Sequence, residues 1–237
     1  MKRERTAVMK IYFIRHGDPN YRDDCLTEKG HVQAEIAAKN LCNSGIEAIY
    51  SSSQGRARQT AEYTAKKLGL DVQPCDFIRE IRWDSIDGSP LIADGHPWNV
   101  SQYRISHDLT LVNDNWREDE QYRNSRVVES VKIVADGVDE WLATLGFVRE
   151  GEYYRVSENI PYKTVAMFSH AGASGAAISH MLNIPFPQFC AAFSLNFVSS
   201  FVVNLADKPG ELVYPQIKFI DDVLYREEKH SQIFYGN

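Results

Sequence analysis

Short apolar runs alternate with longer amphipathic segments along this chain, and the alternation predicts strands followed by helices. Residues 11–14 are all apolar and lie just before Gly17 and Pro19, a pattern typical of a buried strand that ends in a turn. Residues 163–168 form a second such run, which precedes Gly172. Shorter runs at 47–50 and 70–74 predict two further strands. The sequence therefore predicts an α/β fold.

Four segments are expected to be helices. Thr27 is a candidate N-cap for the first, and Gly45, Gly69 and Gly146 are candidate stops for the first three. The hydroxyls of residues 51–53 are expected to cap the second. Gly137 lies inside the third and should weaken it by up to about 1 kcal/mol relative to alanine. The apolar spacing places the first helix between Thr27 and Gly45 and the others at 57–68, 127–145 and 172–182.

The periodic pattern is lost between residues 84 and 126. This stretch is longer than a structureless loop should be in a compact domain. We therefore expect a cap insertion at about 84–126, with a short helix near 100–106, within a single domain that spans 1–237. Hairpins are expected at 147–156 and 198–220. Their exposed edges offer a surface through which two copies could pair as a homodimer.

Composition narrows the class of protein. With 237 residues, 43% hydrophobic and 24% charged, the chain can bury a full core. The net charge of −6 makes nucleic acid an unsuitable general partner. After the basic stretch Met1–Arg5, the run at 11–14 is too short for a signal peptide or a membrane span, so we expect a cytoplasmic protein with no membrane partner. Cys25, Cys42, Cys75 and Cys190 lack metal-ligand spacing and are expected to be reduced thiols.

Two of the predicted strands end in a histidine. Arg15-His16-Gly17 follows the first, and Ser169-His170-Ala171-Gly172 follows the strand at 163–168. Because the carboxyl ends of parallel strands meet at one edge of a sheet, both histidines are expected at the same crevice. Arg56 lies in the first turn of a helix that follows another strand, where free amides and the helix dipole favour an anion.

Together with three further motifs, these residues resemble the histidine phosphatase superfamily, in its phosphoglycerate mutase-like branch. The further motifs are Leu26-Thr-Glu-Lys-Gly30, Ser51-Ser-Ser-Gln-Gly-Arg-Ala-Arg-Gln-Thr-Ala61 and Ile78-Arg-Glu-Ile81. The resemblance runs from Lys10 to Leu205 and is thin between Asp87 and Tyr162. It implies a three-layer α/β/α sandwich with a mostly parallel central sheet and a cap. The phytase and acid phosphatase branch follows its Arg-His-Gly with x-Arg-x-Pro, which this chain lacks.

The resemblance also implies roles for individual residues. His16 would become phosphohistidine, and Arg15, Arg56 and His170 would surround the phosphoryl oxygens. Glu80 would be the general acid, although Asp84 and Asp87 lie close enough in sequence to substitute for it. Many relatives carry an asparagine where this chain has Arg22, so Asn20 is expected to take its place. The remaining expected substrate-binding residues are Gly17 and Ala171; neither a metal nor another cofactor is implied.

The expected reaction is hydrolysis of a small-molecule phosphate monoester. Between residues 84 and 126 there are eight acidic residues against four arginines and no lysine, a charge that disfavours highly anionic substrates. A mutase-type phosphoryl transfer and a non-catalytic phosphate- or phosphoprotein-binding module remain as alternatives. His96 lies in the cap and could contact the substrate. The aromatic residues of the cap are expected either to form its core or to contact a ring-bearing leaving group: Trp98, Tyr103, Trp116 and Tyr122.

Overall fold

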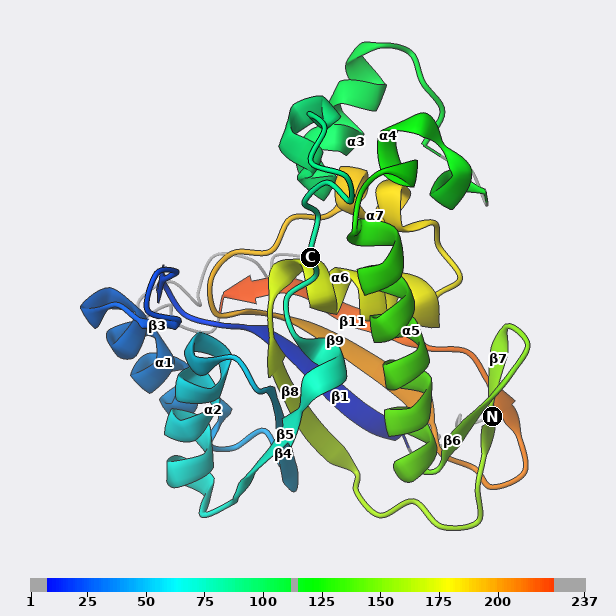
Figure 1. Cartoon of the computed structure of the whole chain (residues 1–237). Helices are drawn as coiled ribbons and strands as arrows, with labels where there is room; N and C mark the ends of the chain where they lie inside the picture. The colour runs from blue at the N-terminus through cyan, green and yellow to red at the C-terminus, as the bar shows by residue number, and fades with distance from the viewer. Residues whose placement is uncertain (1–7, 112–114, 224–237) are drawn as a thin grey trace, which may run out of the picture.

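A computed structural model of the protein describes residues 8–111 and 115–223, with side chains as far as Lys218. Met1–Arg5 and Asp114, which entered the sequence predictions, lie outside the described residues. A six-stranded sheet in the order β11-β9-β1-β8-β4-β5 runs through the centre (Figure 1). Its strands are β1 (Val8–Arg15), β4 (Ala48–Ser52), β5 (Val72–Cys75), β8 (Thr164–Ser169), β9 (Ser199–Ala206) and β11 (Gln216–Val223).

The sheet is mixed. Strands β1, β8, β4 and β5 are parallel neighbours. At the other edge of β1, β9 pairs antiparallel with β1, and β11 pairs antiparallel with β9. Helices cover both of its faces: α1 (Glu28–Leu41) and α2 (Gly55–Leu68) on one, α5 (Val127–Thr144) and α6 (Ala171–Met181) on the other (Figure 1). The α/β fold with helices on both sides of a central sheet is thus confirmed.

The two helical layers explain why β1 reads as a continuous apolar run. Ile11 and Phe13 belong to the core cluster that includes α5 and α6, whereas Ile14 belongs to the cluster that includes α1 and α2. Successive side chains of a strand point to opposite faces, and both faces are covered along residues 11–14, so these positions carry no charged side chain, whereas Lys10 near the start of β1 is exposed. The register places Arg15 opposite Ser169, so the two histidine motifs leave the sheet side by side.

The helix ends agree in part with the sequence predictions. The predicted stop at Gly45 is wrong, because α1 ends at Leu41 with Cys42 as its C-cap. Thr27 caps α1 by accepting from the Gly30 amide at 3.1 Å, and Gly69 ends α2 with a positive φ of 71°. The predicted serine cap of α2 is wrong: the N-cap residue is Gln54, which makes no side-chain capping bond. Ser52 is used differently, because its hydroxyl lies 2.9 Å from His170 Nε2.

Residues 84–111 and 115–126, which we call the cap, lie together beyond the carboxyl ends of the parallel strands (Figure 1). The cap docks on α7 (Phe186–Ala192), a short helix that the sequence pattern did not predict. Trp98 Nε1 donates to the Phe193 carbonyl at 2.6 Å, and the Ser101 hydroxyl donates to the Pro187 carbonyl at 3.0 Å. The cap itself contains α3 (Pro97–Ser106), α4 (Glu120–Arg123) and the 3-10 turns Ile92–Gly95 and Trp116–Glu118.

Two small sheets and one turn complete the described residues. The hairpin predicted at 147–156 is present, and its second strand also pairs with a short strand that interrupts the predicted hairpin at 198–220. These elements are β6 (Phe147–Glu150), β7 (Tyr153–Val156), β10 (Leu212–Val213), β2 (Pro19–Asn20), β3 (Cys25–Leu26) and the 3-10 turn Asp76–Ile78. Within the described ranges, no helix is both long and apolar enough to cross a membrane.

Candidate active site

His16 lies at the carboxyl end of β1 and is 1% exposed. Its Nδ1 donates to the Gly17 carbonyl at 2.7 Å, which places the ring proton on Nδ1 and leaves the lone pair on Nε2. Burial, opposed by this hydrogen bond and reinforced by Arg15 and Arg56, lowers the pKa of His16 to about 3. The imidazole is therefore neutral near pH 7, with Nε2 available as a nucleophile.

Two guanidinium groups flank that imidazole. Arg56 Nε donates to His16 Nε2 at 3.2 Å, and its other end forms an ion pair with Asp24. Arg15 donates to the Leu195 carbonyl and stacks over the Phe197 ring, 4.1 Å from its centroid. Arg15 Nε is buried and has no hydrogen-bond partner among the described residues. This donor is therefore available to a bound anion.

His170 meets His16 from the neighbouring strand β8, with 5.2 Å between the ring centroids. It is 0% exposed, and burial, reinforced by His16 and the two arginines, lowers its pKa well below the usual range. Nε2 lies 2.9 Å from the Ser52 hydroxyl, whereas Nδ1 is buried with no partner in the described part of the chain. The site thus contains a second buried nitrogen without a partner.

Glu80 follows the 3-10 turn Asp76–Ile78 and lies against the start of α6. Its Oε1 accepts from the amides of Ile81 at 3.1 Å and Ala173 at 3.0 Å. Desolvation outweighs these hydrogen bonds and raises the pKa of Glu80 above its usual value. The close contact between Glu80 and the start of α6 requires glycine at 172, because a Cβ there would lie 2.6 Å from Glu80 Oε1. A carboxyl group with a raised pKa can hold a proton at a pH where an exposed one cannot.

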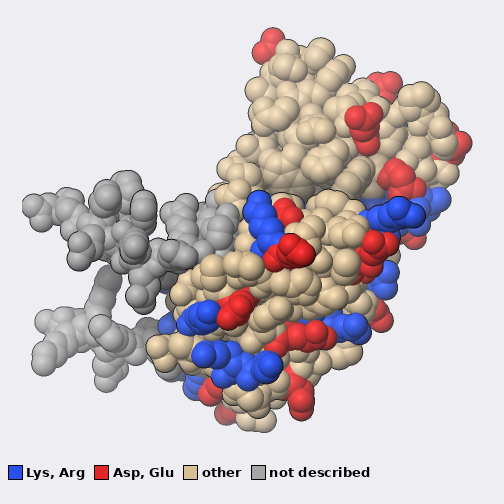
Figure 2. Space-filling view, turned by 90° about the vertical axis from the view of Figure 1, so that its left-hand side faces the viewer, with Lys and Arg blue, Asp and Glu red and all other residues tan. Residues whose placement is uncertain are grey.

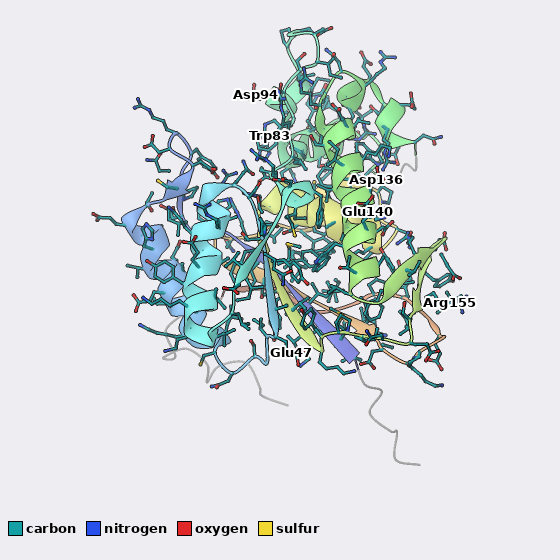
Figure 3. All side chains as sticks on the ribbon, turned by 60° about the horizontal axis from the view of Figure 1, so that its bottom comes forward. Glu47, Trp83, Asp94, Asp136, Glu140 and Arg155 are labelled. Carbon is teal, nitrogen blue, oxygen red and sulfur yellow. The ribbon has the colours of Figure 1, made fainter. Side chains whose placement is uncertain are left out.

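A cavity of about 550 Å³ opens above these groups. We call Arg15, His16, Arg56, Glu80 and His170 the floor; Arg15, Arg56 and Glu80 belong to the cavity lining, whereas the two histidines are buried next to them. We call the aromatic lining residues Trp83, His96 and Trp98 the roof. Trp83 lies where the cap joins the body of the molecule (Figure 3). The cavity lining consists of Arg15, Tyr21, Arg56, Glu80, Trp83, His96, Trp98, Ala171, Gly172, Ser194 and Leu195. The floor is therefore polar and the roof aromatic.

Of the other predicted site residues, only some line the cavity. Ala171 lines the cavity, whereas the Gly17 amide donates to Thr60 Oγ1 at 3.0 Å and so is not directed at a substrate. Asn20 bonds Asp23 and the backbone of its own loop, away from the lining. Of the three candidate acids only Glu80 lines the cavity: Asp84 pairs with two arginines, and Asp87 is held by Asn124 and two serines.

Sequence reasoning missed two residues of the polar loop before α1. Tyr21 is 64% exposed and lines the cavity, with its ring 5.4 Å from the Arg56 guanidinium. Asp24 adopts a positive φ of 48° and accepts from both the Gly55 amide and Arg56. Burial would raise the pKa of Asp24, but these hydrogen bonds lower it overall. A lone loop aspartate gives no sequence signal for such a role.

The described residues contain no group of three or more His, Cys, Asp or Glu side chains that could hold a metal ion. The anion-binding capacity of the site comes from its arginines, its two buried nitrogens without partners and the amides at the start of α6. Such a set fits a tetrahedral anion placed over His16 Nε2.

Comparison with known proteins identifies the family of this chain. Residues 11–214 match the family model of the histidine phosphatase superfamily, branch 1. Similar curated proteins include the probable phosphoglycerate mutase GpmB of Serratia proteamaculans, 24% identical over 75% of this chain and 77% of that protein. The GpmB of Citrobacter koseri is 27% identical, with the same coverage of both chains.

Solved structures share the fold. A mycobacterial glucosyl-3-phosphoglycerate phosphatase superposes with a TM-score of 0.60 and 20% identity, over 90% of this chain and 99% of that one. A phosphoserine phosphatase mutant from Entamoeba histolytica gives 0.58 and 20%, over 92% and 98%. The family match covers most of the chain and includes the Arg15 and His16 motif, so this protein belongs to the histidine phosphatase superfamily, branch 1.

Proposed function

We propose that this protein is a phosphatase that hydrolyses phosphate monoesters through a phosphohistidine at His16. The proposal rests on the protonation state and the hydrogen bonding of the floor side chains. A neutral histidine has its Nε2 directed at Arg56, and two buried nitrogens beside it, Arg15 Nε and His170 Nδ1, lack partners among the described residues. These groups supply a nucleophile together with donors for the phosphoryl oxygens.

In the first step, His16 Nε2 attacks phosphorus and the bond from phosphorus to the ester oxygen breaks. The electron pair of that bond goes to the leaving oxygen, which takes a proton from the Glu80 carboxyl group and departs as an alcohol. The guanidinium groups of Arg15 and Arg56 stabilise the charge on the equatorial oxygens. The Gly17 carbonyl accepts a hydrogen bond from the His16 Nδ1–H throughout and so keeps the ring oriented.

In the second step, water attacks the phosphohistidine. Glu80, now a carboxylate, takes a proton from the water as the bond from nitrogen to phosphorus breaks, and inorganic phosphate leaves. The nitrogen lone pair returns to Nε2 and Glu80 is again protonated, so the enzyme regains its starting state. Both steps use the same carboxyl group, whose raised pKa favours the protonated form that the first step needs.

Hydrolysis is favoured over mutase chemistry by the arginines of the cap. A mutase must retain a bisphosphorylated intermediate, which needs cations for a second anionic group. Here Arg104 is buried in an ion pair with Asp119, Arg126 pairs with Asp84, and Arg117 stacks on Trp116. None of the four cap arginines, Arg123 included, belongs to the cavity lining. The relatives named phosphoglycerate mutase nevertheless make this the second candidate.

The test is release of inorganic phosphate from simple monoesters in the presence of EDTA, with wild-type protein and His16→Ala compared side by side. We expect release by the wild type and a loss of at least about 10⁴-fold in His16→Ala, by analogy with removal of a catalytic nucleophile. Acid-labile labelling of the wild type with ³²P should also disappear in the variant. The matched control is His107→Ala, which removes an exposed histidine of the cap outside the cavity lining.

Interconversion of 2- and 3-phosphoglycerate is measured in parallel. Isomerisation that outpaces phosphate release would replace the proposal by the mutase. Folded wild-type protein that binds phosphate but neither hydrolyses nor transfers it would leave only the binding module.

A further inference from the structure

We propose that the roof selects an uncharged, ring-bearing alcohol as the leaving group of the substrate. This inference rests on the proposed phosphatase function and deepens it by naming a substrate class. The leaving group must lie on the side of the phosphoryl group opposite His16 Nε2, because the attacking and departing atoms are in line. The cap lies beyond the carboxyl ends of β1 and β8 (Figure 1) and contributes His96 and Trp98 to the lining of this cavity, where Trp83 joins them.

The roof presents ring surfaces in a fixed arrangement. His96 lies between the two indoles, 4.9 Å from the Trp83 ring at an interplanar angle of 72° and 5.9 Å from the Trp98 ring at 48°. The Trp98 indole is fixed by its hydrogen bond to the Phe193 carbonyl. Tyr21 adds an exposed ring at the cavity wall. Flat, immobilised aromatic faces bind rings at little cost in side-chain entropy.

The sequence left open whether the cap aromatics are core or contact surface, and the structure divides them. Trp116 and Tyr122 are 3% and 1% exposed and meet edge to face inside the cap, with an interplanar angle of 83°. Tyr103 stacks on His107 outside the cavity lining. Trp98 is the member of the predicted set that lines the cavity, and Trp83, which precedes the cap, joins it there.

The roof also lacks a charge that could pair with an anionic leaving group. Among the described lining residues the cations are Arg15 and Arg56, and both belong to the floor. Burial and the nearby Arg15 lower the pKa of His96, so its imidazole is neutral near pH 7. His96 Nδ1 is buried without a partner among the described residues and can serve one hydroxyl or amide of a ligand. A carboxylate placed there would be desolvated and unpaired.

The charge on the outer surface of the cap also disfavours an anionic leaving group. On the face shown in Figure 2, the charged side chains of the cap are mostly acidic, whereas lysines and arginines lie over the body of the molecule. An anionic leaving group would therefore approach the roof against the charge of the cap.

The experiment compares kcat/KM for four esters of primary alcohols, so that leaving-group basicity is similar. They are glycerol phosphate, benzyl phosphate, 4-carbamoylbenzyl phosphate and 4-carboxybenzyl phosphate. The last two match in size and differ in charge. We expect benzyl phosphate to exceed glycerol phosphate by about tenfold or more, and the carbamoyl compound to exceed the carboxylate by about tenfold or more.

Variants assign these ratios to the roof. Trp98→Leu should lower the benzyl to glycerol ratio by about tenfold, whereas Tyr103→Leu, on the same helix but outside the lining, should leave it unchanged. Ser194→Lys places a cation in the wall of the cavity and should raise the carboxybenzyl to carbamoylbenzyl ratio by about two- to fivefold. Ratios within one variant do not depend on the fraction of active protein.

The outcomes separate the two proposals. Hydrolysis of all four esters at equal kcat/KM, or a preference for the carboxylate, would overturn the selection by the roof and leave the phosphatase in place. A Trp98→Leu ratio equal to that of the wild type would do the same. Absence of hydrolysis of every ester by folded protein would instead refute the phosphatase itself.

Discussion

The floor and the roof of the cavity are built in different ways. Four floor residues come from the ends of two adjacent parallel strands, β1 and β8, and from the start of α2; the fifth, Glu80, follows the 3-10 turn Asp76–Ile78 and lies against the start of α6. Its histidines are 1% and 0% exposed, and backbone groups hold the floor side chains: the Gly17 carbonyl holds His16, and the Ala173 amide holds Glu80. The roof comes from the cap, which packs against α7, and from Trp83 just before it, and its members are held mainly by ring contacts.

This difference separates chemistry from selectivity. The charged groups and the lone pair of the floor must lie within hydrogen-bond distance of the reacting atoms. Side chains held by the backbone of regular elements are positioned with that precision. The roof needs only a surface of the right shape and polarity, which an irregular insertion can supply. Substitutions in the floor should therefore lower the rate for every ester by a similar factor, and substitutions in the roof should change the ratio between esters.

The largest expected effect that tests this separation is at Glu80. Glu80→Gln keeps the size of the side chain but removes the proton donated to the leaving oxygen. We expect kcat/KM for benzyl phosphate and for glycerol phosphate to fall by the same factor, about 10²–10⁴. For 4-nitrophenyl phosphate, whose leaving group is stable as an anion, the fall should be much smaller. Steady-state kinetics on the three esters measures this.

The control for Glu80→Gln is Asp84→Asn, which alters an exposed candidate acid outside the cavity lining and should leave all three rates near those of the wild type. If Asp84→Asn gave the large, leaving-group-dependent loss and Glu80→Gln did not, the general acid would be Asp84.

The pH dependence should show a smaller effect of the same origin. Formation of the phosphohistidine needs protonated Glu80, whose pKa is raised by burial, so kcat/KM for benzyl phosphate should fall as the pH rises through that pKa. His16, with a pKa of about 3, stays neutral across the range. Dividing by kcat/KM for 4-nitrophenyl phosphate removes the ionisation shared by both substrates. This ratio should fall about tenfold per pH unit in the wild type and stay flat in Glu80→Gln.

A flat ratio in the wild type would mean that Glu80 does not protonate the leaving group. A ratio that still falls in Glu80→Gln would assign the titration to another group near the cavity.

Much of the floor could be predicted from the sequence because its signals are local. A buried strand that ends in Arg15-His16-Gly17 fixes both the place and the direction of His16, and Arg56 follows from its position in a first helical turn. The details that depend on tertiary contact could not be predicted. Asp24 reaches Arg56 from a loop with no periodic pattern, and Ser52 bonds His170 where a helix cap was expected.

The roof could be located but not described. The loss of periodicity between residues 84 and 126 predicted a cap and the helix near 100–106, and α3 is present there. Which aromatic side chains face the cavity depends on how the cap docks on α7, a helix of seven residues whose apolar sequence carries no clear period. Trp98 and Trp116 therefore look alike in the sequence and separate only in three dimensions.

The smallest expected effect concerns Gly137 in α5. From the sequence, Gly137 only weakens α5, so Gly137→Ala would be expected to stabilise the protein by up to about 1 kcal/mol. In the structure a Cβ at this position would lie 2.3 Å from Phe77 Cβ, in the turn that leads to Glu80. We therefore expect Gly137→Ala to lower the free energy of unfolding by about 1–3 kcal/mol, measured by urea titration.

The same displacement of Phe77 should lower kcat/KM by a few-fold, equally for benzyl and glycerol phosphates, because it shifts Glu80 and leaves the roof unchanged. Ala135→Gly, on the same helix, is the comparison that weakens α5 without crowding Phe77. A Gly137→Ala protein more stable than the wild type would show that the turn moves away at no cost. A changed benzyl to glycerol ratio would show that floor and roof are coupled through α5.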